Sequence, residues 1–117
     1  MRLYLDCANS DQIQTALEFF PISGVTTNPT LISKEKKPLH KVLDAIVEQC
    51  GTSREIFVQV VGNTYEEMLE DVASIHQQYS SRIIIKVPVN AEGIKCMMTL
   101  KKKQIPVLAT CVYTVNQ

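Results

Sequence analysis

The sequence contains few glycines, and its four glycines do not cluster. Phosphate loops of nucleotide-binding proteins are built from closely spaced glycines, so this scarcity argues against a nucleotide site. Long apolar runs are also missing, since no stretch approaches the roughly 20 residues of a membrane-spanning helix. The apolar segment at the amino terminus is too short for a signal peptide, and we expect a cytoplasmic protein without a membrane partner.

An excess of either charge is missing as well, because 12 basic residues are balanced by 12 acidic ones. A balanced chain gives no general electrostatic reason to bind nucleic acid or an anionic membrane. The four cysteines show neither a CxxC spacing nor an accompanying histidine pattern, which argues against a metal site. In a cytoplasmic protein we expect them to be reduced thiols. They are Cys7, Cys50, Cys96 and Cys111.

Short apolar runs alternate with amphipathic stretches along the chain, a pattern typical of repeated βαβ units. The sequence predicts strands over residues 3–6, 24–28 (ended by Pro29), 56–61, 83–87 and 106–110. It predicts helices that begin after Asn9 or Ser10, after Pro38, at a capping box opened by Thr64, and after Asn90. The apolar residues expected to face inward from these helices are Ile13, Ala16, Leu17 and Phe20; Leu39, Val42, Leu43, Ile46, Val47 and Cys50; Met68, Leu69, Val72 and Ile75; and Ile94, Met97, Met98 and Leu100. No linker interrupts this pattern, so we expect one domain over residues 1–117.

Each expected strand carries a polar residue at or near its carboxyl end, and these residues recur at intervals of about one βαβ unit: Asp6, Asn28, Gln59, Lys86 and Thr110. Side chains alternate between the two faces of a strand, and the spacing allows all five to lie on the same face. In a parallel barrel, that face points inward and the carboxyl ends of the strands carry the chemistry. The pattern therefore favours a polar site at one rim.

Lys86 lies in an otherwise apolar run, residues 83–89, that is typical of a buried parallel strand. Burial disfavours the charged ammonium, so we expect a lowered pKa and a neutral amine that attacks carbonyl groups. The alternative is a strand-end lysine whose head reaches water while its stem covers apolar surface. The four companion residues at the other strand ends favour the first interpretation.

A doubly wound, receiver-like domain is a competing fold, because it also has five βα units in about this length. A chain that resembles receiver domains would have an aspartate at the end of the third strand and a lysine at the end of the fifth. Here the third strand ends in Gln59, the fourth in Lys86 and the fifth in Thr110. The residues therefore fit this fold less well than a barrel.

Five segments, in order along the chain, resemble the transaldolase family, and most closely its small bacterial fructose-6-phosphate aldolases. They are Leu3-Tyr4-Leu5-Asp6, Gly24-Val25-Thr26-Thr27-Asn28-Pro29, Phe57-Val58-Gln59-Val60, Ile85-Lys86-Val87-Pro88-Val89 and Leu108-Ala109-Thr110-Cys111-Val112-Tyr113. The resemblance implies a (βα)8 barrel, of which the chain holds the N-terminal part, about five strands and four helices. It also implies a class I aldolase that needs no metal and no cofactor.

In this resemblance Lys86 matches the lysine that forms a Schiff base with the ketone of fructose 6-phosphate. Cleavage then gives dihydroxyacetone and glyceraldehyde 3-phosphate, and transfer of the dihydroxyacetone unit is the related transaldolase reaction. Asp6 matches the residue that binds substrate hydroxyls and assists proton movement. Gln59 stands where transaldolases have a glutamate, and a glutamine orients water but does not titrate, which favours the aldolase branch.

Three further residues match family positions in the same way. Thr26 and Asn28 match residues that position the dihydroxyacetone portion, while Thr110 matches a threonine that holds the catalytic water. Ordinary structural roles are the alternatives, such as strand polarity for Thr26 and a turn before proline for Asn28. The expected partner is a small sugar phosphate or a dihydroxyacetone-type substrate.

A complete barrel needs about twice as many residues as this chain. We therefore expect a truncated family member, or a fragment that forms a homo-oligomer to cover its unpaired strand edges and apolar inner face. The sequence is compatible with three functions. They are the aldolase, an inactive truncated barrel that acts as an interaction module, and the receiver-like domain.

Overall fold

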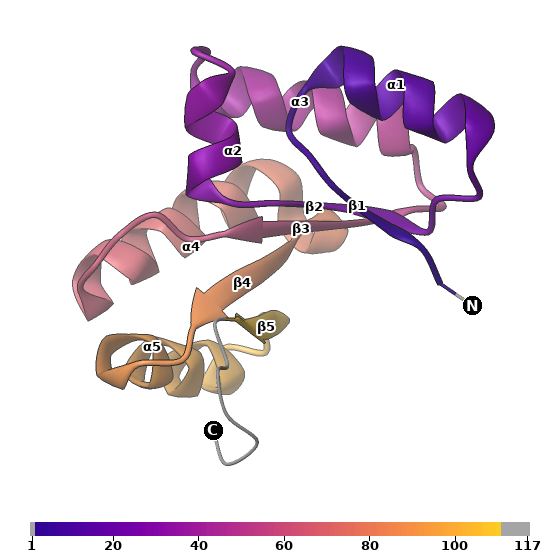
Figure 1. Cartoon of the computed structure of the whole chain (residues 1–117). Coiled ribbons are helices and arrows are strands. Elements are labelled where there is room, and N and C mark those ends of the chain that lie inside the picture. Colours follow the sequence, from indigo (N-terminus) through magenta and orange to yellow (C-terminus); the bar gives the residue numbers. More distant parts are fainter. Residues whose placement is uncertain (1, 111–117) are drawn as a thin grey trace. The chain divides into compact units, whose positions relative to one another are not determined.

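The computed structural model describes residues 2–110 and has the expected α/β architecture, in which parallel strands alternate with helices (Figure 1). This arrangement is consistent with part of a parallel barrel. The chain forms two compact units, Met1–Val58 and Gln59–Gln117. A single domain over the whole chain stays a prediction.

The first unit is built on parallel strands β1 (Tyr4–Asp6), β2 (Gly24–Thr27) and β3 (Glu55–Gln59), of which the last residue, Gln59, belongs to the second unit. β1 pairs with β2, and β2 pairs with β3, so that Asp6 lies beside Thr26 and Thr26 beside Phe57. The expected strands are therefore confirmed, with ends that differ by one or two residues. The third strand ends earlier than expected, and Val61 lies outside it with 55% of its surface exposed.

Helices α1 (Ser10–Phe19) and α3 (Leu39–Cys50) lie side by side in this unit (Figure 1). Asn9 caps α1 by accepting a hydrogen bond from the Gln12 backbone N–H. The apolar core joins the strands to these helices, and its fully buried members include Val25, Ile56, Val58, Ile13, Leu43 and Ile46. The inward position expected of Phe20 is wrong, because Phe20 follows the last turn of α1 and is 58% exposed.

A short helix, α2 (Pro29–Lys34), follows β2 directly and was not expected. Pro29 does end the strand, but it also occupies the first helical turn, where proline is tolerated because that N–H has no helical partner. Asn28 caps this helix through its side chain. Pro29 therefore both ends β2 and begins α2.

The second unit holds parallel strands β4 (Ile84–Pro88) and β5 (Val107–Thr110), with Lys86 beside Leu108. Helix α4 (Tyr65–Tyr79) and the 3₁₀ turn η1 (Ser80–Arg82) precede β4, and α5 (Ala91–Lys102) connects it to β5. The capping box is confirmed. The Thr64 hydroxyl accepts from the Glu67 N–H at 3.2 Å, and the Glu67 carboxylate accepts from the Thr64 N–H at 3.1 Å.

The inward face of α5 differs from the expected one. Leu100 is buried as expected, but Ile94 and Met98 are 46% and 62% exposed, and Gly93 and Cys96 are buried in their place. A Cβ atom at Gly93 would lie 1.8 Å from the Pro88 carbonyl oxygen. The helix therefore approaches the end of β4 through its one glycine, and this contact fixes which residues turn inward.

Cys7, Cys50 and Cys96 are buried and take part in no disulfide within residues 2–110, and Cys111 lies outside the described residues. Within residues 2–110, no helix combines the length and the apolar character required to cross a membrane.

Candidate active site

Burial alternates along the strands, which separates a face packed on helices from a more polar face. In β3, Ile56 and Val58 are buried, whereas Phe57 and Gln59 are half-buried. β4 repeats this alternation, with Lys86 half-buried between two buried neighbours. Each predicted strand-end residue of these two strands therefore lies on the face that does not pack against helices.

Asp6 and Thr26 contact each other at the carboxyl ends of β1 and β2. The Thr26 hydroxyl donates a hydrogen bond of 2.8 Å to Oδ1 of Asp6. The parallel register places the two residues directly side by side. This bond gives the Asp6 carboxylate a fixed orientation on a mostly exposed strand end.

Asn28 lies one residue beyond β2, at the cap of α2. Its Oδ1 accepts a hydrogen bond of 2.9 Å from the Leu31 N–H. The structural role considered for Asn28 is therefore present. Because the cap uses the oxygen, the group that the side chain turns to other partners is the amide NH₂.

Tyr4 and Phe57 form an aromatic layer on the same strand face as Asp6. Their rings meet edge to face, with centroids 5.7 Å apart, and the Tyr4 hydroxyl donates to Oε1 of Glu55 at 2.5 Å. A Cβ atom at Gly24 would lie 2.9 Å from the Tyr4 ring, so glycine makes room for this layer. We did not identify the Tyr4–Glu55 contact from the sequence, although the parity of Tyr4 and Asp6 places both on this face.

Lys86 and Gln59 are neighbours in the second unit. The N–H of Val60 donates to the carbonyl of Lys86 at 3.0 Å. In a parallel ladder this bond sets the preceding residue, Gln59, opposite Lys86, so both side chains leave the same face. The lowered pKa expected of Lys86 stays a prediction.

Thr110 is the last residue of β5 and lies beside Pro88 in the ladder, and its side chain is outside the described part of the structure. The six candidate residues thus fall into two sets: Asp6, Thr26 and Asn28 in the first unit, and Gln59, Lys86 and Thr110 in the second. Among residues 2–110, no three His, Cys, Asp or Glu side chains are grouped to hold a metal ion.

The six residues lie at or next to the carboxyl ends of parallel strands, which is where barrel enzymes carry their catalytic residues. The comparison with protein families agrees with this type of fold. Residues 3–117 match the family model for transaldolase/fructose-6-phosphate aldolase. The chain therefore belongs to this family of Schiff-base aldolases, which confirms the resemblance seen in the sequence and excludes the receiver-like fold.

Proposed function

We propose that the chain is a class I aldolase that cleaves or forms fructose 6-phosphate, with transaldolase transfer as the related reaction. The observation that carries this proposal is the position of Lys86, half-buried on the polar strand face and opposite Gln59. A glutamine beside the lysine favours aldol cleavage, because glutamine positions water and cannot itself exchange a proton. We further propose a cytoplasmic location and one domain over residues 1–117.

In the proposed reaction the Nζ atom of Lys86 attacks the C2 carbonyl of the ketose. Loss of water gives an iminium ion, which withdraws electrons from the neighbouring bonds. The C3–C4 bond then breaks, its electron pair forms an enamine, and the C4 hydroxyl loses its proton as glyceraldehyde 3-phosphate leaves. Protonation of the enamine and addition of water release dihydroxyacetone and regenerate the amine.

Asp6 is our candidate for the group that takes the C4 hydroxyl proton. The Thr26 hydroxyl holds one of its oxygens at 2.8 Å, so the carboxylate is oriented before substrate arrives. We assign the Asn28 amide to a dihydroxyacetone oxygen, since its own oxygen already caps α2. Gln59 and Thr110 would orient the water that hydrolyses the iminium ion.

A retro-aldol assay tests this proposal. Purified protein is incubated with fructose 6-phosphate, and glyceraldehyde 3-phosphate is detected with a coupled dehydrogenase. We expect product with the wild-type chain and none above background with Lys86→Met. Equal rates for the two proteins would overturn the assignment of Lys86. No product from a folded wild-type chain would instead favour the inactive interaction module.

Exposed aromatic residues at the end of α1 favour association of the chain with itself. Phe19 and Phe20 are 71% and 58% exposed and adjacent in sequence. Adjacent apolar side chains of this size mark interaction surfaces more often than single exposed residues do. We therefore propose a homo-oligomer, whatever the outcome of the activity assay.

A further inference from the structure

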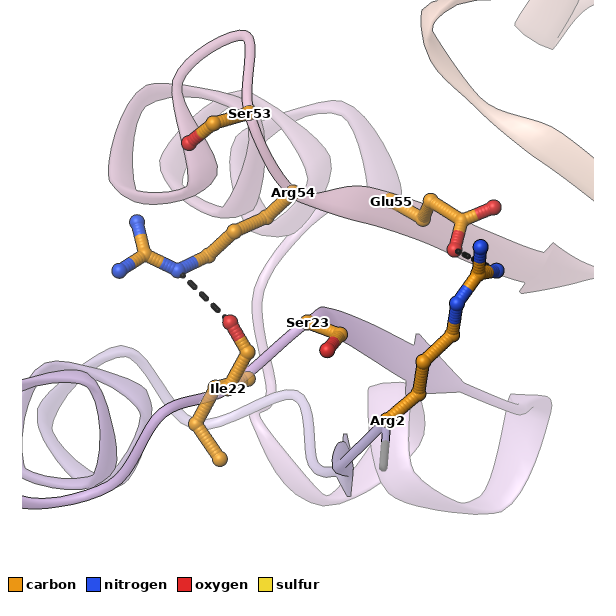
Figure 2. Close-up of a pocket in the computed structure, with 6 residues that line it drawn as sticks. All are labelled: Arg2, Ile22, Ser23, Ser53, Arg54 and Glu55. Atoms are coloured by element: carbon orange, nitrogen blue, oxygen red, sulfur yellow. Dashed lines mark hydrogen bonds and ion pairs between the residues drawn. The ribbon is translucent and has the colours of Figure 1, made fainter.

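A cavity of about 530 Å³ lies at the amino ends of β2 and β3, at the opposite end of these strands from Asp6 and Thr26 (Figure 2). Six residues line it: Arg2, Ile22, Ser23, Ser53, Arg54 and Glu55. All belong to the first unit. None of them takes part in the proposed aldol reaction.

Arg54 is held in place by one of its five N–H donors. Its Nε donates to the carbonyl oxygen of Ile22 at 3.2 Å, and the residue is half-buried. The remaining four donors lie on the two terminal nitrogens, which Figure 2 shows turned away from Ile22. A guanidinium fixed through Nε presents these nitrogens as a fork suited to two oxygens of one anion.

The cavity carries an excess of positive charge, since two arginines face one carboxylate. A terminal nitrogen of Arg2 lies 3.7 Å from Oε1 of Glu55, so this carboxylate is paired with Arg2. A hydrogen bond that Arg2 donates to Tyr4, together with the charges of Tyr4 and Glu55, raises the pKa of Arg2 above its ordinary value. Among residues 2–110, no carboxylate forms an ion pair with Arg54.

The backbone around the cavity is tied into the sheet. The N–H of Ser23 donates to the Leu3 carbonyl at 2.7 Å, and the N–H of Glu55 donates to the Ser23 carbonyl at 3.0 Å. Ser23 is therefore fixed between two strands, and its hydroxyl forms part of the cavity wall (Figure 2). Binding to walls that are already ordered costs little conformational entropy.

We propose that this cavity binds a phosphate group, either as inorganic phosphate or as a phosphate monoester. The Arg54 fork would hold two phosphate oxygens, and the Ser23 and Ser53 hydroxyls would donate to the others. A phosphate has enough oxygens, pointing in different directions, for donors from several sides, whereas a carboxylate has only two in one plane. The charge surplus also favours a dianion over a neutral ligand.

Titration of the full chain with inorganic phosphate at constant ionic strength, followed by the ³¹P line width, tests this proposal. We expect saturable binding, weakened at least about tenfold in Arg54→Gln, which loses the charged hydrogen bonds. Lys102→Gln is the matched control, because it removes one exposed positive charge from the last turn of α5. It should bind like wild type. Absence of saturation, or equal weakening in both variants, would overturn the proposal.

A second variant keeps the test decisive if Arg54→Gln fails to fold. The double variant Ser23→Ala/Ser53→Ala leaves every charge in place, and we expect it to weaken phosphate binding by several-fold. Unchanged binding in this folded variant would refute the site.

Glycerol 3-phosphate is titrated in parallel: tighter binding than inorganic phosphate identifies a monoester site, and weaker binding identifies a site for free phosphate. Because the readout is binding, failure of the aldolase assay leaves this test unaffected.

Discussion

Lys86 gains its proposed reactivity from its neighbours in the ladder. It is half-buried between Ile85 and Val87, both of which are fully packed. Gln59 lies opposite it through the Val60 hydrogen bond. The strand face on which Lys86 and Gln59 lie can be predicted from the sequence. The alternation of apolar and polar residues along a strand is enough to assign each side chain to a face. The Tyr4–Glu55 contact was missed because it joins residues 51 positions apart and has no local signal.

Cys96 gives a pH-dependent test at the scale of one residue. The thiol is fully buried in α5. Burial, and then the negative charge of Asp71, raise the pKa of Cys96 above its ordinary value of 9.0. The folded chain holds this proton more tightly than the unfolded chain does. The contribution of Cys96 to stability is therefore complete below pH 9.0 and is lost as the pH rises through the folded pKa.

Urea denaturation across this alkaline range measures the effect. We expect the free energy of unfolding to fall more steeply with pH in wild type than in Cys96→Ala, which has no group to titrate at this position. The comparison uses slopes, so the cavity left by the substitution does not enter. Identical slopes for the two proteins would contradict the prediction, because they would show that ionisation of Cys96 does not change the free energy of unfolding.

At the scale of elements, most helices and strands were predictable, because each has local signals such as a cap, an apolar stripe or a strand parity. Two features were not. Helix α2 was missed, since proline was read as the end of a strand and six residues are too few for a periodic stripe. The inward face of α5 was misassigned, because the close approach of Gly93 to Pro88 is a tertiary contact and leaves no mark in the apolar pattern.

Gly93→Ala tests that close approach. The added Cβ would lie 1.8 Å from the Pro88 carbonyl oxygen, so α5 or the end of β4 must shift. We expect the free energy of unfolding to fall by about 3 kcal/mol, measured by urea denaturation. Gly51→Ala is the matched control. A Cβ atom at Gly51 would have no atom within 4 Å, so it causes no clash. The positive φ of 61° at this position disfavours alanine, and we expect the free energy of unfolding to fall by about 1 kcal/mol. Equal losses would contradict the packing described for α5.

Asn28 allows the cap of α2 to be separated from the proposed contact with substrate. Aspartate caps helices as well as asparagine does, so Asn28→Asp should change the free energy of unfolding by less than about 0.5 kcal/mol. It removes the amide donor, however, and we expect kcat/KM to fall at least about tenfold. Asn28→Ala should lose both properties, with about 1 kcal/mol of stability. Full activity in Asn28→Asp would remove Asn28 from the substrate site.

At the scale of the whole molecule, the family assignment rests on segments distributed over residues 3–117 and was predictable from the sequence. Association of the chain with itself is also a property at this scale. We expect size-exclusion chromatography to show a larger species as the protein concentration rises. The double substitution Phe19→Ser/Phe20→Ser should shift elution toward the monomer, whereas Leu39→Ser, at a less exposed site, should not. A monomer at every concentration would refute the proposed homo-oligomer.

The most direct test of the proposed chemistry is borohydride reduction in the presence of dihydroxyacetone, followed by peptide mass spectrometry. A Schiff base forms only with a neutral amine, and reduction converts it into a stable adduct. We expect an adduct on Lys86, its absence in Lys86→Met, and little labelling of the exposed Lys95. An unmodified Lys86 in the folded chain, or equal labelling of Lys86 and Lys95, would contradict it.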